Sequence, residues 1–74
     1  MPNKHGQITT DDFVAPEGKF RIIHEDMRDG ELEIVADFYK QLPAEQFTKG
    51  LIENSSDDDI FTLWDSSGKE VELS

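Results

Sequence analysis

The sequence predicts a small α+β fold, in which one short helix packs on a small antiparallel sheet made of two β-hairpins. Two alternating apolar segments flank Asp29 and Gly30, a dipeptide typical of hairpin turns. A second pair of segments, over residues 60–64 and 69–74, flanks the turn-forming sequence DSSG. Between the two pairs, apolar residues after Pro43 recur at helical spacing. The expected order is therefore hairpin, helix, hairpin.

The N-terminal segment differs in composition from the rest of the chain. Residues 1–12 are polar and carry one isolated isoleucine, so they lack the apolar surface that would offset the entropy cost of ordering. We expect a mobile polar arm over 1–12 and a single small domain over 13–74. Residues 15–18, with the sequence APEG, are expected to form a turn because proline fixes its own φ and glycine adopts a positive one without strain.

The first predicted hairpin joins a strand over residues 19–25 to a second strand that starts at Leu32. The first strand alternates, with Phe20, Ile22 and His24 on one face. In the second strand, one face is expected to carry Leu32, Ile34, Ala36 and Phe38. A helix over 31–42 remains open as an alternative, because several apolar residues of this range also fall at helical spacing.

The helix is expected to run from about Pro43 to Glu53. Proline is favoured in a first helical turn, and Asn54 with the serines after it is typical of a helix end. One side of this helix carries Phe47, Leu51 and Ile52. Gly50 inside it costs about 1 kcal/mol relative to alanine, which could also move the helix end forward.

In the second hairpin, Ile60, Thr62 and Trp64 form the face opposite Phe61 and Leu63. We expect Trp64 to cover the helix and Phe61 to stand outside, because large aromatic side chains dominate small cores. The alternative is that Trp64, with acids around it, serves as a binding anchor, since tryptophan is enriched in interface cores.

The net charge is −10, from 17 acids against 7 bases. Each half of the chain carries −5, so the acid is spread along the sequence. Such a field repels phosphates and anionic membranes and speeds encounter with basic surfaces. We therefore expect a basic protein partner and no direct contact with nucleic acid or membrane. The alternative explanation is that the acidity serves solubility alone.

The chain has no cysteine, so neither a disulfide nor a zinc site with thiolate ligands can stabilise its small core. Efficient packing or a second copy of the chain, in a homodimer, would have to supply that stability. No apolar run approaches the roughly 18 residues of a spanning helix, and the first twenty residues lack the apolar stretch of a secretory signal. These features predict a soluble, cytoplasmic protein.

The segment HEDMRDGELE, residues 24–33, invites a zinc interpretation because it begins with histidine and glutamate. That motif needs a second histidine four residues on, and this position holds Arg28. The spacing of its acids also misses the calcium-loop template. We interpret the segment as a polar hairpin turn whose acids are partly neutralised by Arg28. His24 is expected to be a strand residue at the sheet edge, and we predict no metal, cofactor or catalytic residue.

The second acidic segment, SSDDDIFTLWD, begins at Ser55 and also misses the calcium spacing. Its three aspartates either solvate the loop or contact a partner, as like-charge runs often do. The candidate partner-binding residues are Asp26, Asp29, Glu31, Glu33, Asp57, Asp58, Asp59 and Trp64.

Together, these observations predict a non-enzymatic protein that binds a basic partner and regulates or inhibits it. In its sharper form, the hypothesis is nucleic-acid mimicry. Alternate strand residues lie roughly 6.5 Å apart, so Glu31 with Glu33, or Glu70 with Glu72, would present regularly spaced charges. The rival is a structural, self-associating domain that dimerises or adds a strand through an exposed edge. An enzyme that uses His24 and the neighbouring acids is the third class, and no nucleophile constellation accompanies it.

Overall fold

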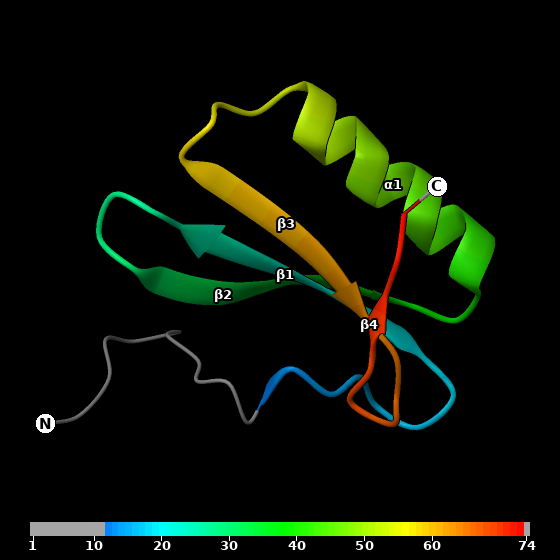
Figure 1. Ribbon diagram of the computed structural model, residues 1–74. Coiled ribbons are helices and arrows are strands. Elements are labelled where there is room, and N and C mark those ends of the chain that lie inside the picture. Colours follow the sequence, from blue (N-terminus) through cyan, green and yellow to red (C-terminus); the bar gives the residue numbers. More distant parts are fainter. Residues whose placement is uncertain (1–11, 74) are drawn as a thin grey trace, which may run out of the picture.

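A computed structural model describes residues 12–73 and confirms the predicted fold class (Figure 1). Its elements are β1 (Phe20–Asp26), β2 (Glu31–Phe38), α1 (Gln41–Glu53), β3 (Asp59–Trp64) and β4 (Glu70–Val71). The four strands form an antiparallel sheet in the order β2-β1-β3-β4, so β1 and β3 are central. The helix packs on one face of this sheet, mainly over β3.

The turn between β1 and β2 follows the prediction from Asp29 and Gly30. Gly30 has a φ of 75°, which glycine adopts without the strain that a Cβ would cause. Its backbone N–H donates to the Asp26 carbonyl at 2.7 Å. The Asp29 carboxylate accepts from the backbone N–H of Glu31 at 3.0 Å, so this side chain also holds the turn.

The strand prediction for β2 is confirmed, and the helical alternative for residues 31–42 is wrong over most of that range. The prediction that all apolar residues from Leu32 to Phe38 at alternate positions share one face is also wrong, because β2 contains a β-bulge. Ile22 pairs with Ala36 and Ile23 pairs with Ile34, so Val35 has no opposite residue on β1. A bulge inserts one residue into the alternation and exchanges the two faces beyond it.

The bulge divides the apolar residues of β2 between the two faces of the sheet. Val35 and Phe38 pack against the core under the helix. Ile34 lies opposite Ile23 on the other face, and 37% of its surface is exposed. Leu32 shares that face by alternation.

The helix α1 begins at Gln41, two residues before the predicted start, and Gly50 lies inside it. Its side buried against the sheet carries Ala44, Thr48 and Leu51. The Thr48 hydroxyl donates to the Ala44 carbonyl at 2.7 Å, so its burial leaves no unpaired polar atom. Phe47 and Ile52, expected beside Leu51, are 46% and 44% exposed.

Three fully buried side chains form the core between helix and sheet: Ile22 of β1, Ala44 of α1 and Leu63 of β3. Apolar side chains from every element pack around them, and these are Phe20, Val35, Phe38, Leu51, Phe61, Val71 and Leu73. The small Ala44 lets the helix backbone approach the sheet closely. The core therefore depends on a few residues that make contacts in both layers.

The second hairpin is shorter than predicted, because β4 contains only Glu70 and Val71. The Asp65 carboxylate organises its turn by accepting from the backbone N–H groups of Ser67 and Lys69 at 2.9 and 3.0 Å. The hydrogen bond from the Ser67 hydroxyl to the same oxygen, at 2.7 Å, is the main reason why the pKa of Asp65 is lowered. Leu73 follows β4 without belonging to a strand, yet it packs on the core.

Trp64 and Phe61 lie on the faces opposite to those predicted. Phe61 packs against the core beneath α1, whereas Trp64 faces away from the helix. The ring of Phe13 packs on Trp64 with centroids 4.9 Å apart. The backbone N–H of Ala15 donates to the Asp65 carbonyl at 3.0 Å, so the segment before β1 lies at this end of the sheet.

The predicted arm over residues 1–12 lies outside the described residues, apart from Asp12. The Asp12 carbonyl accepts from Nη1 of Arg21 at 3.3 Å. No helix within the described part of the chain is both long and apolar enough to cross a membrane.

Replacing Gly50 with alanine is expected to raise the free energy of unfolding by about 0.5–1 kcal/mol. Glycine lowers helix stability, and an added Cβ at Gly50 would meet no atom within 4 Å. Urea unfolding measures the change, and Gly30→Ala is the matched control because its positive φ makes the same substitution destabilising. Unchanged or lower stability of the Gly50 variant would contradict this prediction.

Candidate functional site

Two acidic segments that are far apart in the sequence meet at one end of the sheet. The Cα pairing places Glu31 of β2 on one side of Asp26 and Asp59 of β3 on the other. Neighbouring strands are about 4.8 Å apart, so these three acids form a row across three strands. The loop before β3 joins the β1–β2 turn directly, because the backbone N–H of Met27 donates to the Asp58 carbonyl at 2.7 Å.

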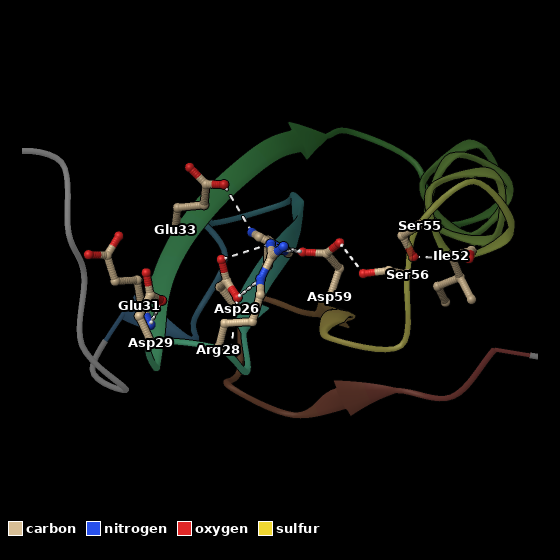
Figure 2. Close-up of polar contacts among 10 residues, drawn as sticks. Asp26, Arg28, Asp29, Glu31, Glu33, Ile52, Ser55, Ser56 and Asp59 are labelled. Atoms are coloured by element: carbon tan, nitrogen blue, oxygen red, sulfur yellow. Dashed lines mark hydrogen bonds and ion pairs between the residues drawn. The ribbon is translucent and has the colours of Figure 1, made fainter.

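We call the seven acids that gather here the acidic end of the sheet, and Figure 2 shows several of them. They are Asp26, Asp29, Glu31, Glu33, Asp57, Asp58 and Asp59. Each was predicted as a partner-binding residue. The eighth predicted residue, Trp64, lies at the opposite end of β3. Its indole N–H donates to the Thr62 hydroxyl at 2.8 Å and its ring packs on Phe13, so the structure separates it from the acids.

His24 holds the acidic end together from the middle of the sheet. Its Nδ1 lies 3.0 Å from Oε1 of Glu33 on β2, and its Nε2 lies 2.8 Å from Oδ1 of Asp59 on β3. The ring stacks on Phe61 with centroids 4.8 Å apart, and only 15% of the side chain is exposed. The predicted position at the sheet edge is wrong, because β1 is a central strand with a neighbour on each side.

The two carboxylates around His24 favour its protonated form. Burial alone would lower the pKa of the imidazole, but the hydrogen bonds to Asp59 and Glu33 outweigh it and raise the pKa above its usual value. The same contact with His24 is the main reason why the pKa of Asp59 is lowered. The protonated ring donates from both nitrogens and thereby cross-links three neighbouring strands.

Arg28 neutralises part of the acidic end, as the sequence predicts. Its Nε and Nη2 contact the two carboxylate oxygens of Asp26 at 2.9 and 3.1 Å, and its backbone N–H donates to the same side chain. These hydrogen bonds lower the pKa of Asp26 and raise that of Arg28. Nη2 also lies 3.5 Å from Asp59, so the guanidinium connects the turn to β3 (Figure 2).

The seven acids therefore differ in what they do. Asp59 is a structural residue, because it contacts His24 and also accepts from the Ser56 hydroxyl at 3.1 Å. Asp57 and Asp58, by contrast, are exposed in the loop before it. Glu33 combines both properties, since its side chain contacts His24 yet remains 64% exposed. The exposed members present the negative charge, while Asp59 and His24 fix the strands beneath them.

The arrangement around His24 differs from a serine–histidine pair. A serine nucleophile requires direct contact between the hydroxyl and the imidazole that takes its proton. Here Asp59 lies between Ser56 and His24, and both ring nitrogens contact carboxylates. Among residues 12–73, no three histidine, cysteine or acidic side chains are grouped as ligands of a metal ion.

Comparisons of the chain with family models, curated proteins and solved structures gave no match.

The sequence predicted His24 as a strand residue at the sheet edge and did not predict its contact with Asp59. That contact depends on the register between β1 and β3, which places Phe61 directly opposite His24 and Asp59 opposite Asp26. In the sequence, β2 and α1 lie between these two strands, so no turn sequence fixes their register. The alternation that places His24 on the core face with Ile22 was the available signal that its ring would be partly buried.

Proposed function

We propose that the protein is a non-enzymatic binding protein, and that its acidic end docks a basic surface of a partner protein. The observation that supports this proposal is the convergence of two acidic segments at the ends of three neighbouring strands. Among the described residues, seven carboxylates gather there together with Arg28 and with His24, whose pKa is raised by its two carboxylate partners. The excess of negative charge would accelerate encounter with a basic surface and help to orient it.

The basic residues of the described chain strengthen this asymmetry, because most of them lie away from the acidic end. Lys19, beside the start of β1, has its Nζ 4.7 Å from the ring centroid of Tyr39, just after β2. Arg21 binds Asp37 through two contacts of 2.8 and 3.1 Å. The far end of the first hairpin thus carries paired or partly screened charge, whereas the acidic end carries an excess.

Imitation of nucleic acid is the sharper form of the proposal, with regulation or inhibition of the partner as its consequence. Glu31 and Glu33 lie on one strand and are spaced by roughly 6.5 Å, as alternate residues of a strand are. A basic surface that binds a phosphate backbone would meet regular negative charge there. The second expected pair is not on one strand, because β4 ends at Val71, before Glu72.

Neutralising the two exposed aspartates, in an Asp57→Asn/Asp58→Asn variant, should weaken partner binding at least about tenfold without unfolding the protein. Both side chains are exposed, whereas Asp59 contacts His24, so the double substitution removes charge without breaking that contact. The measurement is capture from lysate of the source cells on immobilised protein, followed by stepwise salt elution and mass spectrometry. We expect a basic protein that elutes early in the salt series.

The matched control is Glu17→Gln/Glu72→Gln, which removes the same charge from exposed positions outside the acidic end. This control variant should still capture the partner. The affinity of the captured partner is then measured by titration for the unmodified protein, the double aspartate variant and the control variant. Equal affinity for the double aspartate variant and the unmodified protein would refute the proposal, as would retention that does not depend on salt.

A further inference from the structure

The single helix covers only part of the face of the sheet on which it packs. A helix with its side chains is about 10–12 Å across and neighbouring strands lie about 4.8 Å apart, so one helix covers roughly two strands. In this fold α1 lies mainly over β3 (Figure 1). On the β4 side, Leu73 packs on the core from the segment that follows β4. On the other side, α1 covers the helix side of β2 only in part.

Phe47 marks the side of α1 that borders β2. Its ring packs on that of Phe38, at the end of β2, with centroids 5.4 Å apart, yet 46% of Phe47 is exposed. Val35 and Phe38 contact the core from β2, and both remain half-buried. An apolar surface therefore extends from α1 onto β2, and we call Val35, Phe38 and Phe47 the β2-side surface.

The spacing of helices and strands indicates what would fit on the β2-side surface. Neighbouring helices pack roughly 8–10 Å apart. In the strand order β2-β1-β3-β4, β2 lies two strands from β3, which is a distance of about 9.6 Å. A second helix packed beside α1 would therefore lie over β2. It would contact Phe47 with one flank and Val35 with the side that faces the sheet, and it would complete the helix layer.

The charge beside the β2-side surface indicates the chemistry of such a helix. Glu33 lies on the helix side of β2, where it contacts His24 and is still 64% exposed. The loop that carries the exposed Asp57 and Asp58 joins the end of α1 to β3 at the same end of the sheet. Lys40, which is exposed, precedes α1 at the opposite end. Basic side chains of a docked helix are therefore complementary to the Glu33 end of the surface.

We infer that the β2-side surface receives an amphipathic helix of the basic partner, which packs beside α1 over β2. The apolar stripe of this helix contacts Val35, Phe38 and Phe47, and its lysines or arginines lie beside Glu33. The inference rests on the proposed function and specifies how the partner docks beside the acidic end. A second copy of the chain is disfavoured as the occupant, because two molecules with a net charge of −10 repel each other.

The test uses the full-length protein labelled with ¹⁵N and a capped helical peptide of about 15 residues, with leucines along one face and lysines and alanines on the others. One control peptide has the same composition, but its leucines are distributed around the helix. The other keeps the leucine pattern and replaces every lysine with glutamate. We expect the amphipathic lysine peptide to shift the amide resonances of Val35, Phe38 and Phe47 and to bind at least about tenfold more tightly than either control.

The possible outcomes separate this inference from the proposal on which it rests. Equal binding of the two lysine peptides, with shifts centred on Asp57 and Asp58, would overturn helix docking while leaving the electrostatic proposal in place. No binding of the amphipathic lysine peptide, or equal binding of the glutamate peptide, would also overturn it. So would sedimentation of the protein as a dimer that Phe47→Ala dissociates, because the occupant would then be a second copy. The salt-dependent capture with the Asp57→Asn/Asp58→Asn variant decides separately whether the acidic end binds a basic partner.

Within the protein, Phe47→Ala should lower affinity for the amphipathic lysine peptide at least about tenfold, because it removes the aromatic side chain between the two helices. The matched control is Ile52→Ala, which should change this affinity by less than about twofold. Ile52 is 44% exposed and lies about 140° from Phe47 around α1, on the far side of the buried Ala44 and Thr48. Circular dichroism verifies that both variants fold. If the two substitutions weaken peptide binding equally, the β2-side surface is not the site.

Discussion

Replacing Leu63 with alanine should lower the free energy of unfolding by about 3 kcal/mol. Leu63 is fully buried in the centre of β3 and belongs to the core with Ile22 and Ala44. Truncating a buried leucine removes its favourable transfer from water and leaves a cavity, at a typical cost of about 2–5 kcal/mol. A domain of this size has a total stability of only about 3–5 kcal/mol. The variant should therefore be partly unfolded at room temperature without denaturant.

Urea unfolding followed by circular dichroism measures this effect, and Leu42→Ala is the control. Leu42 lies on α1 and is 63% exposed, so the same chemical change there should alter stability by less than about 0.5 kcal/mol. If Leu63→Ala is too unstable to measure, Ile22→Val should still show a loss of about 1 kcal/mol, because Ile22 is also fully buried. Equal effects of the two leucine substitutions would show that the core is not where the structure places it.

Local sequence signals predicted the elements of this fold well, because turn chemistry acts over a few residues. Asp29 with Gly30, and Asp65 with Gly68, mark turns in which the aspartate side chain accepts backbone hydrogen bonds and the glycine has a positive φ. Pro43 lies in the first turn of α1, and Asn54 follows its end. These signals do not depend on tertiary contacts, so the order of strands and helix followed from them.

The faces of those elements could not be predicted from the same signals. Val35 forms a bulge that moves Ile34 and Phe38 to different faces, and no residue type marks a bulge of this kind in advance. On α1, the apolar pattern favoured Phe47, but the close approach of helix and sheet selected the smaller Ala44 and Thr48 for burial. Packing between layers thus decided which of several apolar sides became the core.

The candidate site was predictable as a list of acids but not as an arrangement. Charge alone identified Asp57 and Asp59, together with the acids of the first hairpin. What separates their roles is the β1–β3 register, which brings Asp59 to His24 and leaves Asp57 exposed. Pairing of strands that are distant in sequence depends on the whole fold, so the contacts between His24 and the acids could not be predicted from the sequence.

Removing the imidazole, in His24→Gln, should destabilise the protein by about 1 kcal/mol near pH 6 and by less at pH 9. His24 joins β2 and β3 through Glu33 and Asp59, and hydrogen bonds to charged partners contribute more than neutral ones. Partial access of solvent to Glu33 reduces the effect below that of a fully buried pair. Urea unfolding at a series of pH values measures the difference between the variant and the unmodified protein.

The sign of the pH dependence follows from the directions of the two pKa shifts. The pKa of His24 is raised in the folded protein, so its contribution is complete below the unfolded value of about 6.5 and is lost as the pH rises through the folded pKa. The pKa of Asp59 is lowered, so its contribution is present above an unfolded value of about 3.9 and is lost as the pH falls through its folded pKa. The stability difference should therefore be largest between these two limits, from about pH 4 to pH 6.5.

Taking the difference between the two proteins isolates His24, because both retain every other titrating group, including His5. In a protein that keeps His24, the Asp59→Asn substitution should reduce the loss of unfolding free energy that accompanies deprotonation of the ring as the pH rises. It removes one of the two carboxylates that favour the protonated ring. A difference that is flat from pH 5 to pH 9 would show that the ring does not carry the charge that joins the three strands. A difference that grows as the pH rises would reverse the sign and exclude the protonated imidazole as the stabilising form.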